Sequence, residues 1–427
     1  MSEWRNWSGS VVARPAEILR PTTEEELSRH VAQANKVRVV GAGHSFMPLC
    51  ETDGLLLNLD ALEGSIEIAP DGLSGWAPAG WSLARLTRAL WDKGYSLPNQ
   101  GDVNPQSLAG AISTGTHGTG AELGSLATFA RAFRLVLADG SVVQCSRTER
   151  PELFEAQRLS LGLLGVVTRI EVDLVPAFHL QERLSVRPLA EIAAEWEELA
   201  VRHRHVEFWV FPYSDRAILK TLDICAPAPE PKTASDMSEG IFKFYCELAA
   251  AMPRLTPRLQ HILMRLIGKS SRSGPAYSVF PSERSTRFEE MEYELPRAAG
   301  FAALNEVTEW IRRKRLPVSF PFEYRLVAAD DIWLSPFNKG PGASVSMHQY
   351  AKMPWREIFA EAETIFRSHG GRPHWAKRHT LTAADVSALY PMADRFLTVR
   401  QQVDPAGKFA NTHLTALFGI DPPAPQL

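Results

Sequence analysis

A glycine-rich turn followed directly by a histidine is the first stretch of the chain with residue types suited to cofactor chemistry. Residues 37–46 read Val-Arg-Val-Val-Gly-Ala-Gly-His-Ser-Phe. The β-branched residues favour a strand, and the two glycines let the backbone turn sharply and lie close to a ligand. Phe46 stands where the dinucleotide fingerprint G-x-G-x-x-G needs its third glycine, so a Rossmann-type site is not favoured. The stretch predicts a cofactor loop, with an ordinary strand-to-loop turn as the alternative.

A second glycine-rich stretch has the composition of a phosphate-binding loop. Residues 104–120 read Asn-Pro-Gln-Ser-Leu-Ala-Gly-Ala-Ile-Ser-Thr-Gly-Thr-His-Gly-Thr-Gly, with no Asp, Glu, Lys or Arg. The backbone N–H groups and hydroxyls of such a loop can bind a diphosphate with little help from cationic side chains. Two loops of this kind predict one large cofactor.

Two pairs of chemically active side chains stand two residues apart in segments that read as strands. They are Glu323 with Arg325 and His348 with Tyr350. Because side chains alternate between the faces of a strand, each pair lies on one face. Such pairs can line a pocket for a polar substrate. A solvated ladder of ion pairs on an antiparallel sheet is the alternative that spacing alone leaves open.

Length and composition limit the class of protein. The chain has 427 residues, of which 45% are hydrophobic and 22% charged, and its formal net charge is −3. These values fit a globular protein of two domains with no electrostatic attraction for nucleic acid or anionic lipid. The four cysteines lack a C-x-x-C motif, which argues against a zinc site and a disulfide framework. No apolar run reaches the length of a membrane span, so we expect a soluble, cytoplasmic protein without a bound metal.

The elements that must position these residues begin as a mixed helix and strand pattern. Thr23-Glu-Glu-Glu26 is a capping-box sequence that predicts a helix before the first glycine loop. Asp139-Gly140 predicts a hairpin turn. The remaining periodic segments predict strands over residues 55–59, 65–68, 73–78, 131–138, 141–144 and 165–174, and helices over residues 83–93 and 151–158. This first region is expected to end near Pro176.

Longer elements are expected after residue 179. Residues 226–233 are too rich in proline to join a sheet and are expected to form an exposed loop. The pattern predicts helices over residues 189–202, 240–267 and 296–314, and strands over residues 206–211, 217–224, 291–295, 318–326 and 343–350. These elements suit a second domain that covers a substrate.

Four motifs in order give the chain a resemblance to a known family. They are Gly41-Ala-Gly-His-Ser45, Ser113-Thr-Gly-Thr-His-Gly-Thr-Gly120, Glu323-Tyr-Arg325 and His374-Trp-Ala-Lys377. Together they resemble the aldonolactone oxidoreductases and alditol oxidases of the vanillyl-alcohol-oxidase superfamily of flavoproteins. The resemblance implies an α+β fold with an FAD-binding domain of two α/β subdomains and a cap domain built on an antiparallel sheet flanked by helices. The expected boundaries are residues 1–176 for the FAD-binding domain, 177–370 for the cap, and 371–427 for a segment that returns to the first domain.

The resemblance also implies an activity. It implies FAD-dependent oxidation of a sugar 1,4-lactone of the L-gulono or D-arabinono type at a secondary alcohol, by hydride transfer to flavin N5, to give an ascorbate-like product. Oxygen or another acceptor would reoxidise the flavin. Residues 101–107, 291–297 and 347–350 look closer to the lactone enzymes than to the alditol oxidases. Oxidation of a xylitol- or sorbitol-type polyol with hydrogen peroxide production is the alternative within the family.

Individual roles follow from the same resemblance. Arg325 and Lys377 are expected to stabilise negative charge on the reduced flavin, and Glu323 is expected to bind a substrate hydroxyl. His348 is the candidate base. Ser107 and Tyr350 are expected to contact the substrate, and Ser107 also the flavin. Relatives usually have glycine where this chain has Ala376, which adds a methyl group near the flavin.

The expected cofactor is FAD, and the residue expected to carry a covalent bond to its 8α carbon is His44. His117 is expected to be a structural member of the second loop. The full set expected to bind the cofactor is Val40, Gly41, Ala42, Gly43, His44, Ser45, Ser107, Gly110, Ser113, Thr114, Gly115, His117, Gly118, Thr119, Gly120 and Val167.

Overall fold

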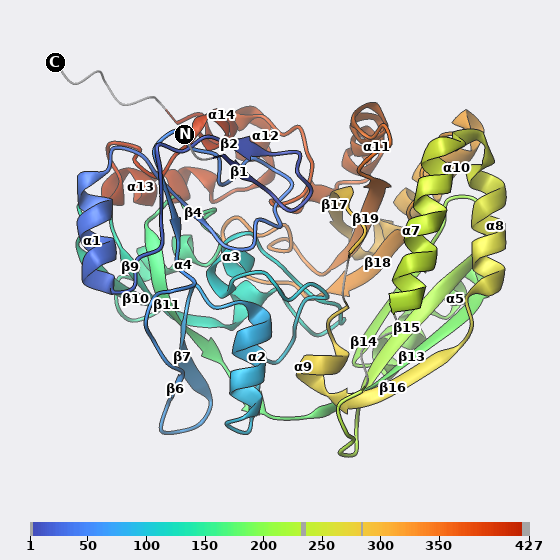
Figure 1. Cartoon of the computed structure of the whole chain (residues 1–427), viewed down its shortest axis with the longest axis horizontal. Helices are drawn as coiled ribbons and strands as arrows, with labels where there is room; N and C mark the ends of the chain where they lie inside the picture. Colours follow the sequence, from blue (N-terminus) through green and yellow to red (C-terminus); the bar gives the residue numbers. More distant parts are fainter. Residues whose placement is uncertain (1–2, 232–235, 283–284, 421–427) are drawn as a thin grey trace.

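A three-stranded parallel sheet carries the first glycine loop. The computed structural model describes residues 3–231, 236–282 and 285–420 (Figure 1). In this sheet the strand order is β3 (Glu17–Leu19), β5 (Leu55–Asn58), β4 (Val37–Val40), and α1 (Glu24–Gln33) joins β3 to β4. Thr23 caps α1 as expected, but Glu26 accepts from the N–H of Thr22, so the capping box is only half formed. β4 ends directly before Gly41.

A five-stranded antiparallel sheet packs beside it in the same lobe, on the left of Figure 1. Its order is β10 (Val142–Ser146), β9 (Ala130–Val136), β11 (Val166–Asp173), β7 (Ser74–Pro78), β6 (Glu67–Ile68). The helices of this region are α2 (Leu83–Trp91), α3 (Leu108–Ser113) and α4 (Pro151–Gln157). All of the helices and strands expected here are present within a few residues of their expected ends.

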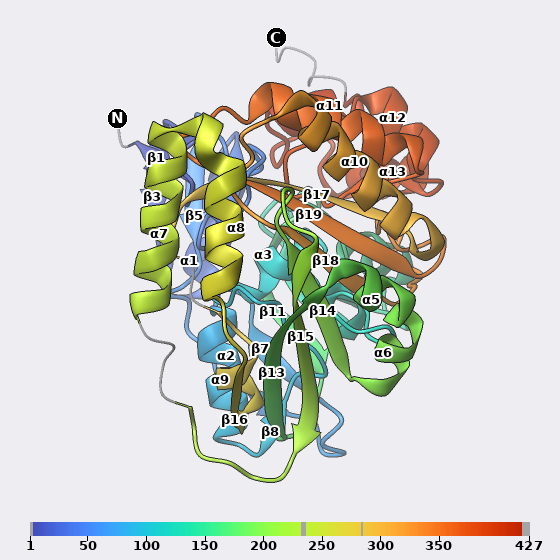
Figure 2. The same ribbon diagram turned by 90° about the vertical axis from the view of Figure 1, so that its right-hand side faces the viewer.

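An eight-stranded antiparallel sheet forms the second lobe (Figure 2). Its order begins β16 (Ser270–Pro275), β13 (His179–Pro188), β15 (Arg216–Cys225), β14 (His205–Val210) and continues β18 (Phe322–Val327), β19 (Gly342–Tyr350), β17 (Phe288–Pro296), β20 (Arg372–Pro373). Neighbouring strands come from distant parts of the sequence, so the sheet brings together side chains that no local pattern connects.

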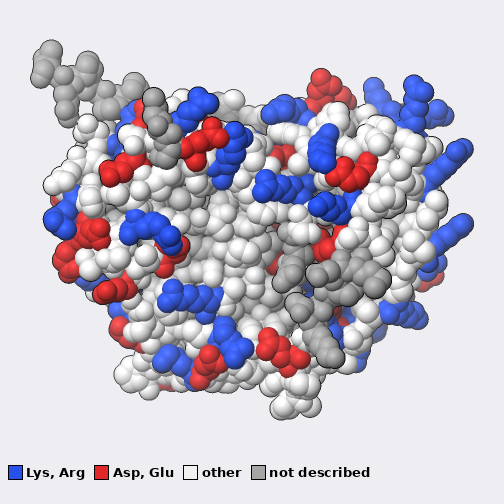
Figure 3. Space-filling view, in the orientation of Figure 1, with Lys and Arg blue, Asp and Glu red and all other residues white. Residues whose placement is uncertain are grey.

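The two faces of this sheet differ in polarity. One face is apolar, with Phe208, Tyr324 and Val345 packed under the helices α5 (Leu189–Ala194), α6 (Trp196–Arg202), α10 (Gly300–Lys314) and α11 (Arg356–Ser368). The other face is charged and also buried, and it carries the alternate residues Lys220, Glu207, Glu323, Arg325, His348, Glu290, Glu292 and Glu294. On the outer face drawn in Figure 3, by contrast, acidic and basic side chains are intermixed. Buried charges must be paired with one another or with a ligand, so this inner face is the candidate for a binding site.

Several expected elements of the second lobe have different bounds in the structure. The expected helix over residues 189–202 is divided at Glu195 into α5 and α6. The expected strand over residues 318–326 begins only at Phe322, because Pro317 and Pro321 lack the N–H that a sheet requires. The expected helical region 240–267 forms α7 (Asp236–Ala251) and α8 (Thr256–Leu266). The proline-rich stretch 226–233 is mostly exposed as far as residue 231, and its last two residues lie outside the described part of the chain.

The C-terminal helices pack against the first lobe. Leu414, Phe396 and Trp375 share one apolar core with residues of β9 and β11, and the helices are α12 (Ala383–Leu389), α13 (Ala393–Val403) and α14 (Thr412–Phe418). This packing supports a C-terminal segment that returns to the first lobe. The domain boundaries at residues 176 and 370 remain our proposal. Among the described residues, no helix combines the length and the apolar composition needed to cross a bilayer.

Candidate active site

A glycine-lined groove runs through the first lobe. It spans about 1000 Å³ of space, part of it open to solvent, and is lined by the first loop, residues 106–114 and residues 161–167. Gly41 permits a close approach of the two glycine loops, because a Cβ atom built there would lie 2.4 Å from Oγ of Ser107. Gly43 has a φ of +68°, a conformation that favours glycine. A groove of this size that is lined by backbone and hydroxyl groups fits a dinucleotide such as FAD.

Eleven of the residues expected to bind the cofactor line this groove. They are Val40, Gly41, Ala42, Gly43, His44, Ser45, Ser107, Gly110, Ser113, Thr114 and Val167. Gly115, His117, Gly118, Thr119 and Gly120 are not among the residues that line it, so their contact with the cofactor stays a prediction.

The chain changes direction after α3. Gly115 has a φ of +77° and turns the chain toward the eight-stranded sheet. There, Oγ1 of Thr119 donates to the carbonyl of Val206 at 2.6 Å, and the N–H of Gly120 donates to Leu326 at 2.8 Å. A Cβ on Gly118 would lie 2.1 Å from the carbonyl of Gln100. The second half of the loop therefore joins the two lobes.

His44 lies on the wall of the groove in a form suited to act as a nucleophile. Its ring stacks on Trp7, with 5.3 Å between the centroids. Burial and the neighbouring Lys377 lower the pKa of His44 to about 4, so the imidazole is neutral at pH 7.

A polar chamber adjoins the groove. It spans about 510 Å³ of space, part of it open to solvent, and is lined in part by the charged face of the sheet. Gln106 lines both cavities, while the consecutive residues Ala376 and Lys377 line the groove and the chamber respectively. The chamber residues are Gly101, Asp102, Val103, Gln106, Thr116, His117, Phe288, Glu290, Glu292, Glu323, Arg325, His348, His374 and Lys377. A cofactor ring at this junction would face the chamber.

The two expected cations are held by buried carboxylates. Nζ of Lys377 lies 2.5 Å from Oε2 of Glu290, and Arg325 donates to Glu292 in a short contact. Burial would raise the pKa of Glu290, but Lys377 and His348 outweigh this and lower it to about 2. Glu290 is therefore ionised throughout the neutral range, and the cation beside it keeps a fixed position.

Several buried polar atoms in the chamber have no hydrogen-bond partner among the described residues. They include Oε1 of Glu323, Nε of Arg325, Oε1 of Gln106 and Oγ1 of Thr116. Glu323 and Arg325 lie close together, with 3.9 Å between Oε1 and Nε. Buried polar atoms are rarely left unpaired, so these atoms are available to a ligand that offers hydroxyl groups.

His348 and Tyr350 do not line one pocket as expected. His348 lines the chamber, with Nε2 at 3.3 Å from Glu290 and Nδ1 at 3.3 Å from the carbonyl of Pro321. Tyr350 lies outside it, and its hydroxyl donates to Glu247 of α7 at 2.6 Å. Strand alternation placed both residues on one face, but α7 covers that face at Tyr350. Ser107 also lies outside the chamber, because it lines the groove and caps α3.

Sequence reasoning missed several residues of the chamber. Glu290 and Glu292 are the most important, because they hold both cations. The signal that could have found them is the alternation of Glu290, Glu292 and Glu294 with apolar residues, which is unusual for a buried strand. Gln106 and His374 lie within motifs described above and Asp102 within residues 101–107, but these motifs gave none of the three a role of its own.

Comparisons with known proteins agree with this geometry. Residues 170–417 match the family model described as D-arabinono-1,4-lactone oxidase, and residues 15–146 match the model of an FAD binding domain. L-gulono-1,4-lactone dehydrogenase from Mycobacterium tuberculosis is 37% identical, with 97% of this chain and 99% of that protein covered. Alditol oxidase from a Streptomyces species is 32% identical, and L-gulonolactone oxidase from Scyliorhinus torazame is 31% identical, each with 97% of this chain and 98% of the relative covered.

A solved structure has the same fold at low sequence identity. Cholesterol oxidase from Brevibacterium sterolicum superposes with a TM-score of 0.84 at 16% identity, over 97% of this chain and 96% of that one. This likeness confirms the expected fold class.

Proposed function

The chain belongs to the D-arabinono-1,4-lactone oxidase family, and we propose that it oxidises a sugar 1,4-lactone at a secondary alcohol with FAD. The observation that carries this proposal is the junction of the two cavities. The glycine-lined groove fits FAD, and the chamber that meets it at Gln106 and Lys377 offers unpaired polar atoms for hydroxyl groups.

The residues of the chamber have separate tasks in this reaction. When bound, FAD takes the hydride from the substrate carbon. Arg325 and Lys377 provide positive charge at the junction, where negative charge develops as the substrate is oxidised. Because both cations are already fixed by carboxylates, little reorganisation is needed during the reaction.

The free oxygen of Glu323 makes it the better candidate for accepting the hydroxyl proton. Both contacts of His348 are with acceptors, the carboxylate of Glu290 and the carbonyl of Pro321, so its ring serves as a donor. Oε1 of Glu323 is buried and has no hydrogen-bond partner. We therefore assign the base role to Glu323 and retain His348 as a residue that positions Glu290.

The finer points of the proposal concern the cofactor and product. A covalent bond from His44 to FAD is supported by the neutral ring on the groove wall. Oxidation of the lactone would give a 2-keto lactone that enolises to an ascorbate-like compound, with oxygen or another acceptor taking the electrons. A cytoplasmic location belongs to the same proposal.

Steady-state kinetics on two substrate series test the function. We expect a higher kcat/KM for L-gulono- or D-arabinono-1,4-lactone than for xylitol or sorbitol, because Glu323 and Arg325 lie close enough to bind neighbouring hydroxyls of one compact ring. Each series is assayed with oxygen and with an artificial acceptor, so that a slow reoxidation is not mistaken for a poor substrate. A clear preference for the polyols would instead support the alditol oxidase alternative.

A further inference from the structure

Glu292 connects both cations of the chamber to a third positive group. Its Oε1 accepts from Arg325 in a short contact and from Oγ of Ser344 at 2.6 Å, and it lies 3.0 Å from Nε2 of His117. Its Oε2 lies 3.8 Å from Nζ of Lys377. One buried carboxylate thus faces Arg325, Lys377 and His117.

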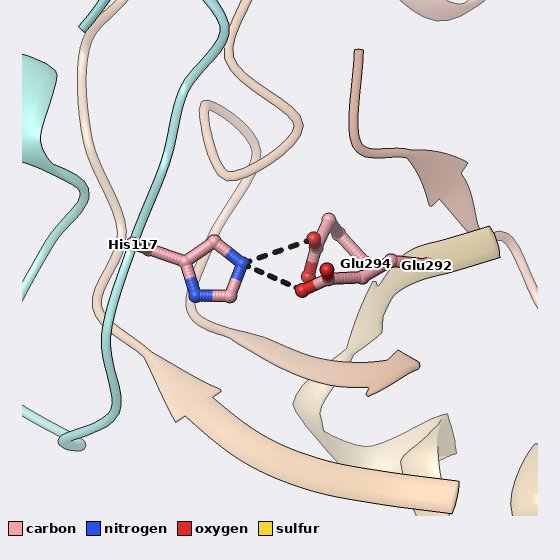
Figure 4. Close-up of side chains that lie close together, drawn as sticks. All are labelled: His117, Glu292 and Glu294. Atoms are coloured by element: carbon pink, nitrogen blue, oxygen red, sulfur yellow. Dashed lines mark hydrogen bonds and ion pairs between the residues drawn. The ribbon is translucent and has the colours of Figure 1, made fainter. Parts of the chain in front are cut away.

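His117 is held as a cation. Nδ1 lies 2.8 Å from the carbonyl of Gly118, and Nε2 faces the carboxylates of Glu292 and Glu294 at 3.0 and 3.2 Å (Figure 4). All three partners are hydrogen-bond acceptors, so a ring that donates to them carries two hydrogens. Burial and the nearby Arg325 would lower the pKa of His117, but Glu294 and then Glu292 outweigh them and raise it to about 9.

The positive charge on His117 affects the other two cations. Glu292 alone would offset much of the charge of Arg325, which is its nearest partner. A buried imidazolium beside the same carboxylate oxygen offsets Glu292 in turn, in a region where charges interact strongly. Glu292 can then hold Arg325 and Lys377 in place without cancelling their potential at the junction.

We propose that His117 and Glu292 are positioning residues, with Glu292 fixing Arg325 and Lys377 beside the cofactor and His117 maintaining their positive potential. The inference rests on the proposed function, since it assigns these residues to the same chamber. Neither residue needs to touch the substrate for this role.

The His117→Gln variant of the full-length, FAD-loaded protein tests whether the charge on His117 raises the midpoint potential of the flavin. Glutamine can still donate to Glu292 but has no charge. We expect the midpoint potential of bound FAD to fall, and flavin reduction at saturating lactone to slow by about tenfold with a smaller change in KM. Combining it with Glu292→Gln removes both charges, so the potential should return toward that of the wild type, while reduction stays slow because Arg325 is no longer held.

Glu363→Gln is the matched control. Glu363 is a buried carboxylate on α11 that accepts from the hydroxyl of Tyr293 at 2.5 Å, so it supports β17 from the apolar face. We expect neither the potential nor the rate to change. If His117→Gln does not retain FAD, Glu292→Gln alone tests the claim through the reduction rate.

A wild-type potential and rate in His117→Gln, or a wild-type rate in Glu292→Gln, would overturn the proposal. Dye equilibration measures the potential without substrate. A wild-type protein that no lactone reduces would therefore count against the proposed function and leave the result on the potential standing.

Discussion

Nζ of Lys377 lies 2.5 Å from Oε2 of Glu290, at the junction between the cofactor groove and the polar chamber. The ammonium group also lies 5.3 Å from the centroid of the Phe46 ring. Contacts from β17 and from the first glycine loop therefore fix one cation between the two lobes.

Replacing Lys377 should slow the chemical step more than it weakens cofactor binding. Lys377→Met keeps most of the side-chain volume and removes the charge, so we expect flavin reduction to slow by about a hundredfold. FAD should stay bound, because the groove is formed by other residues. Stopped-flow reduction under anaerobic conditions measures the effect, and a wild-type rate in the Met variant would refute the assigned role.

The close approach of the two glycine loops should tolerate no side chain at position 41. A Cβ in Gly41→Ala would lie 2.4 Å from Oγ of Ser107, so the loops must separate. We expect the purified protein to lose much of its FAD and the free energy of unfolding to fall by about 1–3 kcal/mol. The control is Gly240→Ala, where a Cβ meets nothing within 4 Å. Equal FAD content in both variants would show that the approach is unimportant.

Local patterns were enough to predict the groove but only half of the chamber. A glycine turn after a β-branched strand is encoded within ten residues, and alternation places Glu323 and Arg325 on one face. Glu292, the partner of Arg325, lies two strands away on β17, and no local pattern connects the two residues. Alternation could not show that α7 covers Tyr350. Composition likewise suggested phosphate binding for residues 115–120, and could not show that the positive φ of Gly115 turns them toward the eight-stranded sheet.

The proposed bond between His44 and FAD has a direct chemical test. We expect acid-precipitated, washed protein to stay yellow and its intact mass to be higher by one FAD. His44→Ala should lose both signals, because His44 alone carries a ring nitrogen among the described residues that line the groove. Free flavin in the supernatant of the wild type would refute the bond, and packing against Trp7 would then be the remaining role of His44.

Acid should destabilise the protein through its buried neutral histidines. Burial, together with His413, lowers the pKa of His379 to about 3, below the value of about 6.5 in an unfolded chain. The unfolded state therefore binds a proton as pH falls below 6.5 while the folded state does not, and stability falls between pH 6.5 and 3. At pH 5 this histidine should lower the free energy of unfolding by roughly 2 kcal/mol.

His379→Asn isolates that contribution, since the amide oxygen can still accept the N–H of Leu381 as Nδ1 of His379 does. Urea unfolding at pH 7.5 and pH 5.0 gives the comparison. Between pH 7.5 and pH 5.0, the free energy of unfolding should fall by about 2 kcal/mol less in the variant than in the wild type. An identical loss in both proteins would mean that His379 is protonated in the folded state.

Anaerobic mixing of the FAD-loaded wild type with L-gulono-1,4-lactone tests the central claim most directly, because no external electron acceptor takes part. We predict complete loss of the oxidised flavin absorbance in one fast phase, whose rate saturates with lactone concentration. The same experiment with xylitol should give a much slower reaction. Flavin that stays oxidised with both L-gulono- and D-arabinono-1,4-lactone, or that xylitol reduces faster than either, would contradict the assignment of the chamber to a sugar lactone.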